Sequence, residues 1–154
     1  MVSLGTTGVY AREYDALDRA VEVGFASGRV ISLAFPPTPT EDADSDHELL
    51  DTVGDYLDGD EEPFDEFEVA LTVDTDERDV LDKIQQVGYG EEVSVSQLAR
   101  MAGLDPNEPE DVEFVDETLR ENPVPLLIPD HRVQGGPYAT PRTVRQTFRE
   151  IEGI

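Results

Sequence analysis

Few side chains in this sequence are suited to covalent chemistry. Cysteine is absent, which excludes disulfides, thiolate metal sites and a cysteine nucleophile. The two histidines, His47 and His131, are too few for a typical zinc site, and we expect neither a metal nor a cofactor. One carboxylate, Asp130, directly precedes His131.

Basic side chains gather in one stretch near the carboxyl end of the sequence. They are Arg132, Arg142, Arg145 and Arg149. Asp130 is the sole acid in this stretch before Glu150. One interpretation is a phosphate-facing patch, since DNA-binding proteins hold the backbone with such side chains. The other is that the arginines pair with acids elsewhere in the chain.

The chain as a whole is strongly acidic. Its 154 residues include 36 Asp and Glu against 11 Lys and Arg, for a formal net charge of −25, and Lys83 is the only lysine. This composition is typical of a halophilic protein, because molar salt shortens the Debye length to about 3 Å and screens the self-repulsion. An acidic protein of an ordinary cell and a nucleic-acid mimic are the alternatives. The same charge argues against non-specific DNA binding, which requires phosphate neutralisation.

The sequence shows no membrane or export signal. No apolar run approaches the roughly 18 residues of a membrane span, and no basic start is followed by an apolar stretch. We therefore expect a cytoplasmic protein without membrane association, and a monomer. A hydrophobic content of 38% is enough for a packed core.

The first half of the sequence predicts a small antiparallel sheet covered by one helix. Residues 20–25 and 29–35 predict a hairpin around a turn at Gly28. Alternating apolar residues predict a further strand over 67–73. Apolar residues at helical spacing predict a helix over 49–57. Acidic loops join these elements.

The second half predicts several short helices. Thr75 and Ser94 are suitable N-caps for the first two, and the second of these ends at Gly103. A third helix passes through Val115 and stops at Asn122. Two short helices joined by a turn that contains glycine suggest a helix-turn-helix.

The end of the chain predicts one extended run and one helix. Residues 124–129 are apolar and bounded by prolines, which predicts a short buried extended run. Thr140 is a suitable N-cap and Pro141 suits the first helical position. Val144 and Phe148 lie on the apolar face of that last helix.

One run in this region is long and unusual. From Asn122 to Val133 it reads Asn-Pro-Val-Pro-Leu-Leu-Ile-Pro-Asp-His-Arg-Val. It resembles the active-site signature of the alkylguanine-DNA alkyltransferases (methylated-DNA–protein-cysteine methyltransferases), which reads Asn-Pro, an apolar run, then Pro-Cys-His-Arg-Val. Every position is compatible except the reactive cysteine, where Asp130 stands. Residues 90–99 resemble the family's helix-turn-helix entry, and 144–152 resemble its closing helix, which ends in a glutamate.

The resemblance implies an α+β fold in two domains. Residues 1–74 would form a small ribonuclease-H-like antiparallel sheet domain. Residues 75–154 would form a winged helix-turn-helix alkyltransferase-like domain. Members of the family flip an alkylated guanine out of the duplex and transfer its alkyl group irreversibly to the cysteine.

The resemblance also implies roles for residues of a site. A histidine matched by His131 activates the family's cysteine, and a glutamate matched by Glu152 orients that histidine. An asparagine matched by Asn122 holds the turn beside the site. A tyrosine matched by Tyr138 lines the base pocket, to which we also assign Val133. Since the cysteine is missing, we expect no catalytic residue but a relic site made of Asp130, His131, Glu152 and Asn122.

Several DNA-contacting positions of the family are altered. Val95 stands where the family has a tyrosine that pushes the flipped phosphate. Glu113 stands where an arginine fills the gap left by the flipped base. Asp116, Glu117 and Thr118 match small residues that face the groove. A helix with this charge is repelled by phosphates.

Three functions are open at this stage. The first is a non-catalytic alkyltransferase-like protein related to DNA repair, which binds alkylated DNA through the four arginines; those arginines and Tyr138 favour it. The second is a degenerate scaffold repurposed for interaction with a protein partner, without DNA binding, which the acidic helix around Glu113 favours. The third is an enzyme in which Asp130 takes an alkyl group as an ester and a water activated by His131 hydrolyses it.

Overall fold

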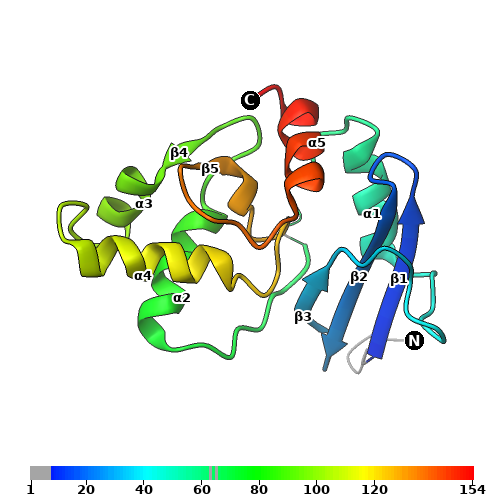
Figure 1. Cartoon of the computed structure of the whole chain (residues 1–154). Coiled ribbons are helices and arrows are strands. Elements are labelled where there is room, and N and C mark those ends of the chain that lie inside the picture. Colours follow the sequence, from blue (N-terminus) through cyan, green and yellow to red (C-terminus); the bar gives the residue numbers. More distant parts are fainter. Residues whose placement is uncertain (1–7, 63, 65) are drawn as a thin grey trace.

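The computed structural model describes residues 8–62, 64 and 66–154 (Figure 1). The amino-terminal part holds a sheet and one helix, and the carboxyl-terminal part holds mainly short helices. The last helix, α5 (Arg142–Glu152), lies beside α1 (Glu48–Leu57), where the two parts meet. The rings of Tyr56 and Phe148 pack there with centroids 5.5 Å apart.

The sheet is antiparallel and has the order β1-β2-β3. Its strands are β1 (Gly8–Tyr14), β2 (Arg19–Ala26) and β3 (Arg29–Ala34). β2 and β3 confirm the predicted hairpin, and Ser27 and Gly28 both take positive φ in its two-residue turn. Sequence reasoning missed β1, because Ala11 is the only residue of this edge strand that is buried and no clear alternation marks it.

The predicted helix over 49–57 is confirmed by α1, whereas the predicted strand over 67–73 is wrong. Val30 exchanges backbone hydrogen bonds with Glu68 and Ala70, at 2.8 and 2.9 Å, which makes a single parallel bridge to Val69. The apolar side chains of this segment are half-buried. The alternation therefore reports a half-buried extended segment and no ladder.

The carboxyl-terminal part contains the predicted helices. They are α2 (Thr75–Gln85), α3 (Val95–Met101), α4 (Pro109–Arg120) and α5. Ser94 caps α3 in a reciprocal capping box with Gln97, as the sequence predicts for its first residue. Two short strands, β4 (Val93–Ser94) and β5 (Val133–Gln134), pair in parallel beside these helices.

Three local predictions in this part are wrong. Thr75 is the first residue of α2, and Asp74 is the N-cap. The N-cap of α5 is Pro141, and Thr140 lies one residue before it. The Thr140 hydroxyl bonds Asp130 and does not cap the helix. Residues 124–129 are buried as predicted but not extended: the Ile128 N–H bonds the Val124 carbonyl at 2.9 Å in a tight turn.

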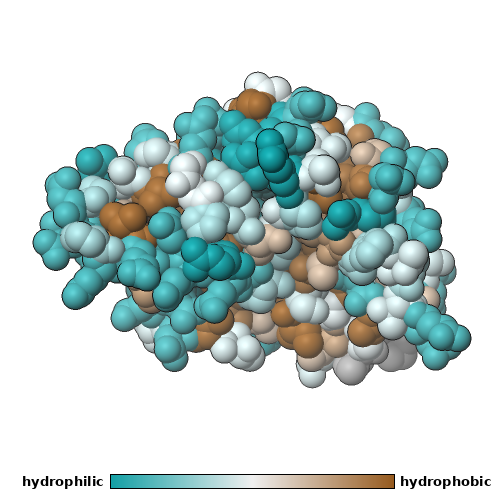
Figure 2. Space-filling view, viewed as in Figure 1, coloured by the Kyte–Doolittle hydropathy of each residue, from teal (hydrophilic) through white to brown (hydrophobic). Residues whose placement is uncertain are grey.

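One continuous apolar core joins both parts, with side chains from the sheet and from all five α-helices. The proposed division between residues 74 and 75 therefore stays a prediction. Hydrophilic side chains dominate the face shown in Figure 2, as the charge implies. No helix in the described part of the chain is long and apolar enough to cross a membrane.

Candidate functional site

Asp130 lies in a 3-10 turn (Asp130–Arg132) and is 0% exposed. Its Oδ1 accepts a hydrogen bond from the Thr140 hydroxyl at 2.6 Å. Its Oδ2 accepts from the backbone N–H groups of Ala139 and Thr140, at 3.0 and 3.3 Å. Burial raises the pKa of Asp130, although these hydrogen bonds and the nearby His131 act in the opposite direction. Asp130 thus bridges its own turn to the segment that precedes α5.

Asn122 holds the turn beside Asp130. Its amide donates to the Ile128 carbonyl at 2.8 Å and lies 3.4 Å from Oδ2 of Asp130. Its side-chain oxygen accepts from the Val124 N–H at 3.1 Å. Leu126, at the tip of this turn, has a φ of 78°, which non-glycine residues rarely adopt. The hydrogen bonds of Asn122 hold this backbone conformation in place.

A second carboxylate, Glu152 at the end of α5, is the centre of a buried cluster. Its Oε2 lies 2.6 Å from Nε2 of His131 and accepts a hydrogen bond from the Tyr56 hydroxyl at 2.5 Å. Arg132 donates to both carboxylate oxygens, at 2.7 and 3.1 Å. We call Glu152, His131, Arg132 and Tyr56 the Glu152 cluster. It links α1 of the amino-terminal part to α5.

The charges of this cluster are set by its contacts. Burial raises the pKa of Glu152, but hydrogen bonds from His131, Arg132 and Tyr56 outweigh it and hold the pKa well below its usual range. Burial lowers the pKa of His131, so its imidazole is neutral and Nε2 donates to Glu152. Nδ1 of His131 is then an acceptor, and it is buried without a hydrogen-bond partner among the described residues.

Tyr138 lines a small open pocket at the surface beside these clusters. The pocket has a volume of about 370 Å³ and is lined by Tyr138, Thr140, Arg142 and Arg145. The Arg145 guanidinium lies over the Tyr138 ring, 4.1 Å from its centroid, and donates to its hydroxyl at 3.1 Å. Val133 does not line this pocket: it is 0% exposed, in the core.

The four arginines are not one surface patch, and this corrects the expectation for two of them. Arg132 is 8% exposed and bound within the Glu152 cluster. Arg149 pairs with Glu92 at 2.5 Å and donates to the His131 carbonyl at 2.9 Å. Arg142 is exposed and Arg145 is half-buried, and both line the Tyr138 pocket. Intramolecular pairing therefore holds for Arg132 and Arg149, and two arginines remain available for a ligand.

α4 presents acidic side chains to solvent, as the sequence suggests, but one of the residues expected to face a groove, Thr118, is buried. Glu113 and Glu117 are exposed, and Asp116 is half-buried. Thr118 is 3% exposed and its hydroxyl bonds the Phe114 carbonyl at 2.8 Å, so it cannot face a groove. Val95, at the start of α3, is half-buried.

Sequence reasoning missed two residues that complete these clusters. Tyr56 bonds Glu152 across 96 positions of sequence, and nothing local marks it beyond its place on the apolar face of α1. Thr140 has the sequence of an N-cap, a threonine before a proline, but its hydroxyl bonds Asp130. No local signal separates the two roles, because the burial of Asp130 is known only from the structure.

Comparison with known proteins agrees with this architecture. Residues 76–146 match the family model of the 6-O-methylguanine DNA methyltransferase DNA-binding domain. A methylated-DNA–protein-cysteine methyltransferase of Metallosphaera sedula is 28% identical over 109 residues, which is 68% of this chain and 66% of that relative. The chain therefore aligns with slightly less than two thirds of that relative's length.

Solved structures of O6-methylguanine methyltransferases have the same fold. The Mycobacterium tuberculosis protein superposes with a TM-score of 0.72 at 19% identity, over 94% of this chain and 93% of that one. The protein of Pyrococcus kodakaraensis superposes with a TM-score of 0.72 at 20% identity, over 96% and 100%. The fold is thus the α+β fold of these methyltransferases. Residues 76–146 are similar to the DNA-binding domain of the O6-methylguanine DNA methyltransferases, and the chain contains no cysteine.

Proposed function

We propose that this protein is a non-catalytic alkyltransferase-like protein that acts in the repair of DNA carrying alkylated guanine. The observation that carries the proposal is the state of Asp130. By the resemblance of residues 122–133 to the family signature, it stands at the position of the acceptor cysteine. It is 0% exposed, and both of its oxygens accept hydrogen bonds. The proposal takes this position as a structural bridge where its relatives have an acceptor.

Alkyl transfer to Asp130 is disfavoured on chemical grounds as well. A carboxylate is a weak nucleophile towards an alkyl ether. An incoming alkyl group would also have to displace the Thr140 hydroxyl or the backbone N–H of Ala139.

DNA contact is proposed at the pocket beside Tyr138. Arg142 and Arg145 are two cations without a salt bridge among the described residues, and they line this pocket together with the Tyr138 ring and Thr140, which binds Asp130. Guanidinium groups suit phosphate oxygens, and a tyrosine ring suits a stacked base. On a chain of charge −25 this contact would require concentrated salt, which fits the proposed halophilic origin.

A binding titration in multimolar KCl tests the proposal. The protein is titrated with a duplex that contains one O6-methylguanine and with the same duplex carrying guanine. We expect binding of the alkylated duplex and its loss in the variant Arg142→Gln/Arg145→Gln. The matched control is Arg29→Gln/Arg78→Gln, which removes two exposed arginines outside the pocket. Both variants therefore have the same net charge. Equal affinities of the two variants would place DNA binding elsewhere.

A second function is favoured by the surface of α4. Glu113 and Glu117 face solvent with no salt bridge in the described part of the chain, on the helix that follows the turn after α3. Phosphates would be repelled there. The second candidate is therefore a scaffold repurposed for binding a protein, without contact to DNA. Absence of binding by the wild-type protein to either duplex would favour it.

A further inference from the structure

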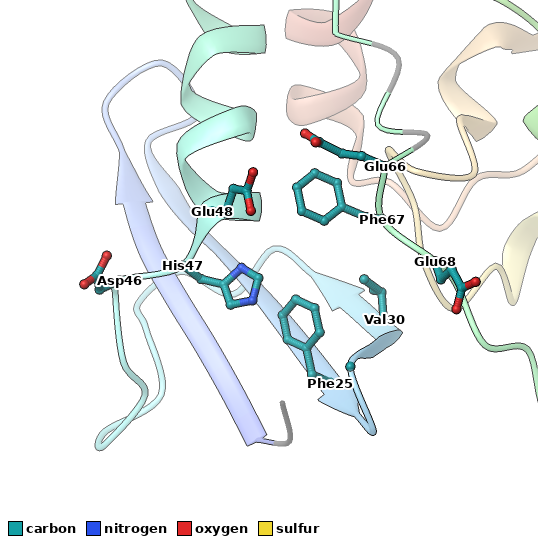
Figure 3. Close-up of a pocket in the computed structure, with 9 residues that line it drawn as sticks. Phe25, Val30, Asp46, His47, Glu48, Glu66, Phe67 and Glu68 are labelled. Atoms are coloured by element: carbon teal, nitrogen blue, oxygen red, sulfur yellow. The ribbon is translucent and has the colours of Figure 1, made fainter. Parts of the chain in front are cut away.

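A larger cavity lies in the amino-terminal part, between the start of α1 and the segment 66–68 (Figure 3). Its volume is about 670 Å³, within the range of small-molecule sites and larger than one side chain requires. It shares no lining residue with the pocket beside Tyr138. The proposed DNA-repair function makes no use of it.

The floor of this cavity is apolar and largely aromatic. Phe25 and Val30 are 4% and 0% exposed and belong to the core, whereas Phe67 is half-buried and projects into the space (Figure 3). The His47 ring stacks on Phe25 with centroids 4.3 Å apart and planes 26° apart. The accessible part of the floor is therefore made by the half-buried rings of His47 and Phe67, because Phe25 and Val30 are covered.

The rim carries only negative side chains. They are Asp46, Glu48, Glu66 and Glu68. Glu48 lies in the first turn of α1, where the helix dipole favours it, and Glu68 pairs with Arg29 at 3.1 Å. Asp46 and Glu66 have no ion-pair partner among the described residues. These two carboxylates are the ones that a ligand can still neutralise.

His47 does not neutralise the rim. Its Nδ1 accepts a hydrogen bond from the Leu49 N–H at 3.0 Å as the N-cap of α1, so that nitrogen carries no proton. Burial lowers the pKa of His47, against the raising effect of Glu48, Asp51 and Asp46. The neutral ring leaves one N–H, on Nε2, as the only side-chain donor among the lining residues.

We propose that this cavity binds a basic segment of a partner protein, with arginine stems against His47 and Phe67 and guanidinium groups at Asp46 and Glu66. Arginine combines an apolar stem and a planar head that stacks on aromatic faces and pairs with carboxylates. A bare cation would use the rim and leave the aromatic floor uncovered. Charge complementarity thus favours a peptide with arginines over a metal ion.

The test uses the full chain and a labelled peptide, Gly-Arg-Leu-Arg-Leu-Arg-Gly, followed by fluorescence anisotropy in about 1 M KCl, where long-range attraction is screened. The site variant is Asp46→Asn/Glu66→Gln. The control is Glu113→Gln/Glu117→Gln on α4, which changes the net charge by the same amount. We expect the site variant to bind about tenfold more weakly, since two partly exposed ion pairs are lost, and the control to bind as the wild type does.

A second readout locates the peptide without any variant that affects folding. We expect the ring signals of His47 and Phe67 to shift in nuclear magnetic resonance spectra when the peptide binds. Equal weakening in both variants, shifts confined to other residues, or binding of free arginine amide as tight as that of the peptide would overturn the proposal. Failure of the protein to bind either DNA duplex would leave this result unaffected.

Discussion

The two buried carboxylates of the carboxyl-terminal part lie in opposite electrostatic surroundings. Asp130 is held by neutral donors, the Thr140 hydroxyl and two backbone N–H groups, and burial raises its pKa. Glu152 is held by the charged Arg132 and by His131, and its pKa is lowered. The same functional group is thus a hydrogen-bond bridge in one place and the anion of an ion pair in the other.

The two carboxylates also connect different parts of the fold. The Glu152 cluster joins α1 to α5, so its loss would affect the contact between the two parts of the fold. Asp130 joins only its own turn to the segment before α5. We infer that His131 and Glu152 have a structural role in this fold that requires no acceptor beside them. Four expected outcomes test this contrast.

The largest effect is expected for Glu152→Gln. The substitution leaves the guanidinium of Arg132 buried without its anion, which typically destabilises a protein by about 3 to 5 kcal/mol. The measurement is the free energy of unfolding from denaturant titration in molar KCl. Glu150→Gln is the control, because Glu150 is exposed on the same helix and its loss changes the net charge equally. Similar values for the two variants would contradict a structural role for the Glu152 cluster.

Asp130→Asn is expected to destabilise the protein less, by about 1 to 3 kcal/mol, because the amide leaves a neutral donor unpaired but no buried charge. The same unfolding titration measures it. A greater loss of unfolding free energy for Asp130→Asn than for Glu152→Gln would reverse the expected order of the two carboxylates.

The two substitutions should respond to pH in opposite directions. The lowered pKa of Glu152 stabilises the fold above the unfolded value of about 4.3, and this contribution is lost as the pH falls. The raised pKa of Asp130 makes its contribution largest below about pH 3.9 and smaller as the pH rises through the folded value. The destabilisation by Glu152→Gln should therefore grow as the pH rises towards about 4.3 and then level off, and that by Asp130→Asn should shrink as the pH rises above about 3.9. If the destabilisation by both substitutions changed with pH in the same direction, the pKa values of Glu152 and Asp130 would not be shifted in opposite directions by their surroundings.

The smallest effect is expected from salt on the Glu152 cluster. Repulsion among exposed acids weakens as the Debye length falls from about 10 Å to about 3 Å, so the wild-type unfolding midpoint should rise between 0.1 M and molar KCl. A buried ion pair is screened much less. The difference in unfolding free energy between Glu152→Gln and wild type should then change by less than about 0.5 kcal/mol. Equal wild-type midpoints would remove the proposed halophilic adaptation.

Local signals in the sequence predicted much of the fold. The hairpin around Gly28 and the capping box at Ser94 are encoded by neighbouring residues, and both are found. The strand expected over 67–73 failed because alternation records burial, whereas pairing depends on a partner edge that the sequence does not specify.

The site was predictable only in part. The signature run predicted Asp130, His131 and Asn122, which the structure brings together. The contacts of Asp130 with Thr140 and of His131 with Glu152 come from residues outside that run. Tyr56 comes from the other part of the chain to bond Glu152. No pattern within a window of sequence reports such a contact, since it depends on how α1 and α5 pack.

The most direct test of the central claim is the intact mass of the wild-type protein after incubation with a duplex that contains O6-methylguanine. Binding is confirmed in parallel by titration in multimolar KCl. We expect a complex, an unchanged protein mass and an intact methylated base. A gain in mass of one methyl group, mapped to Asp130, would show that the carboxylate is an acceptor and would contradict the claim.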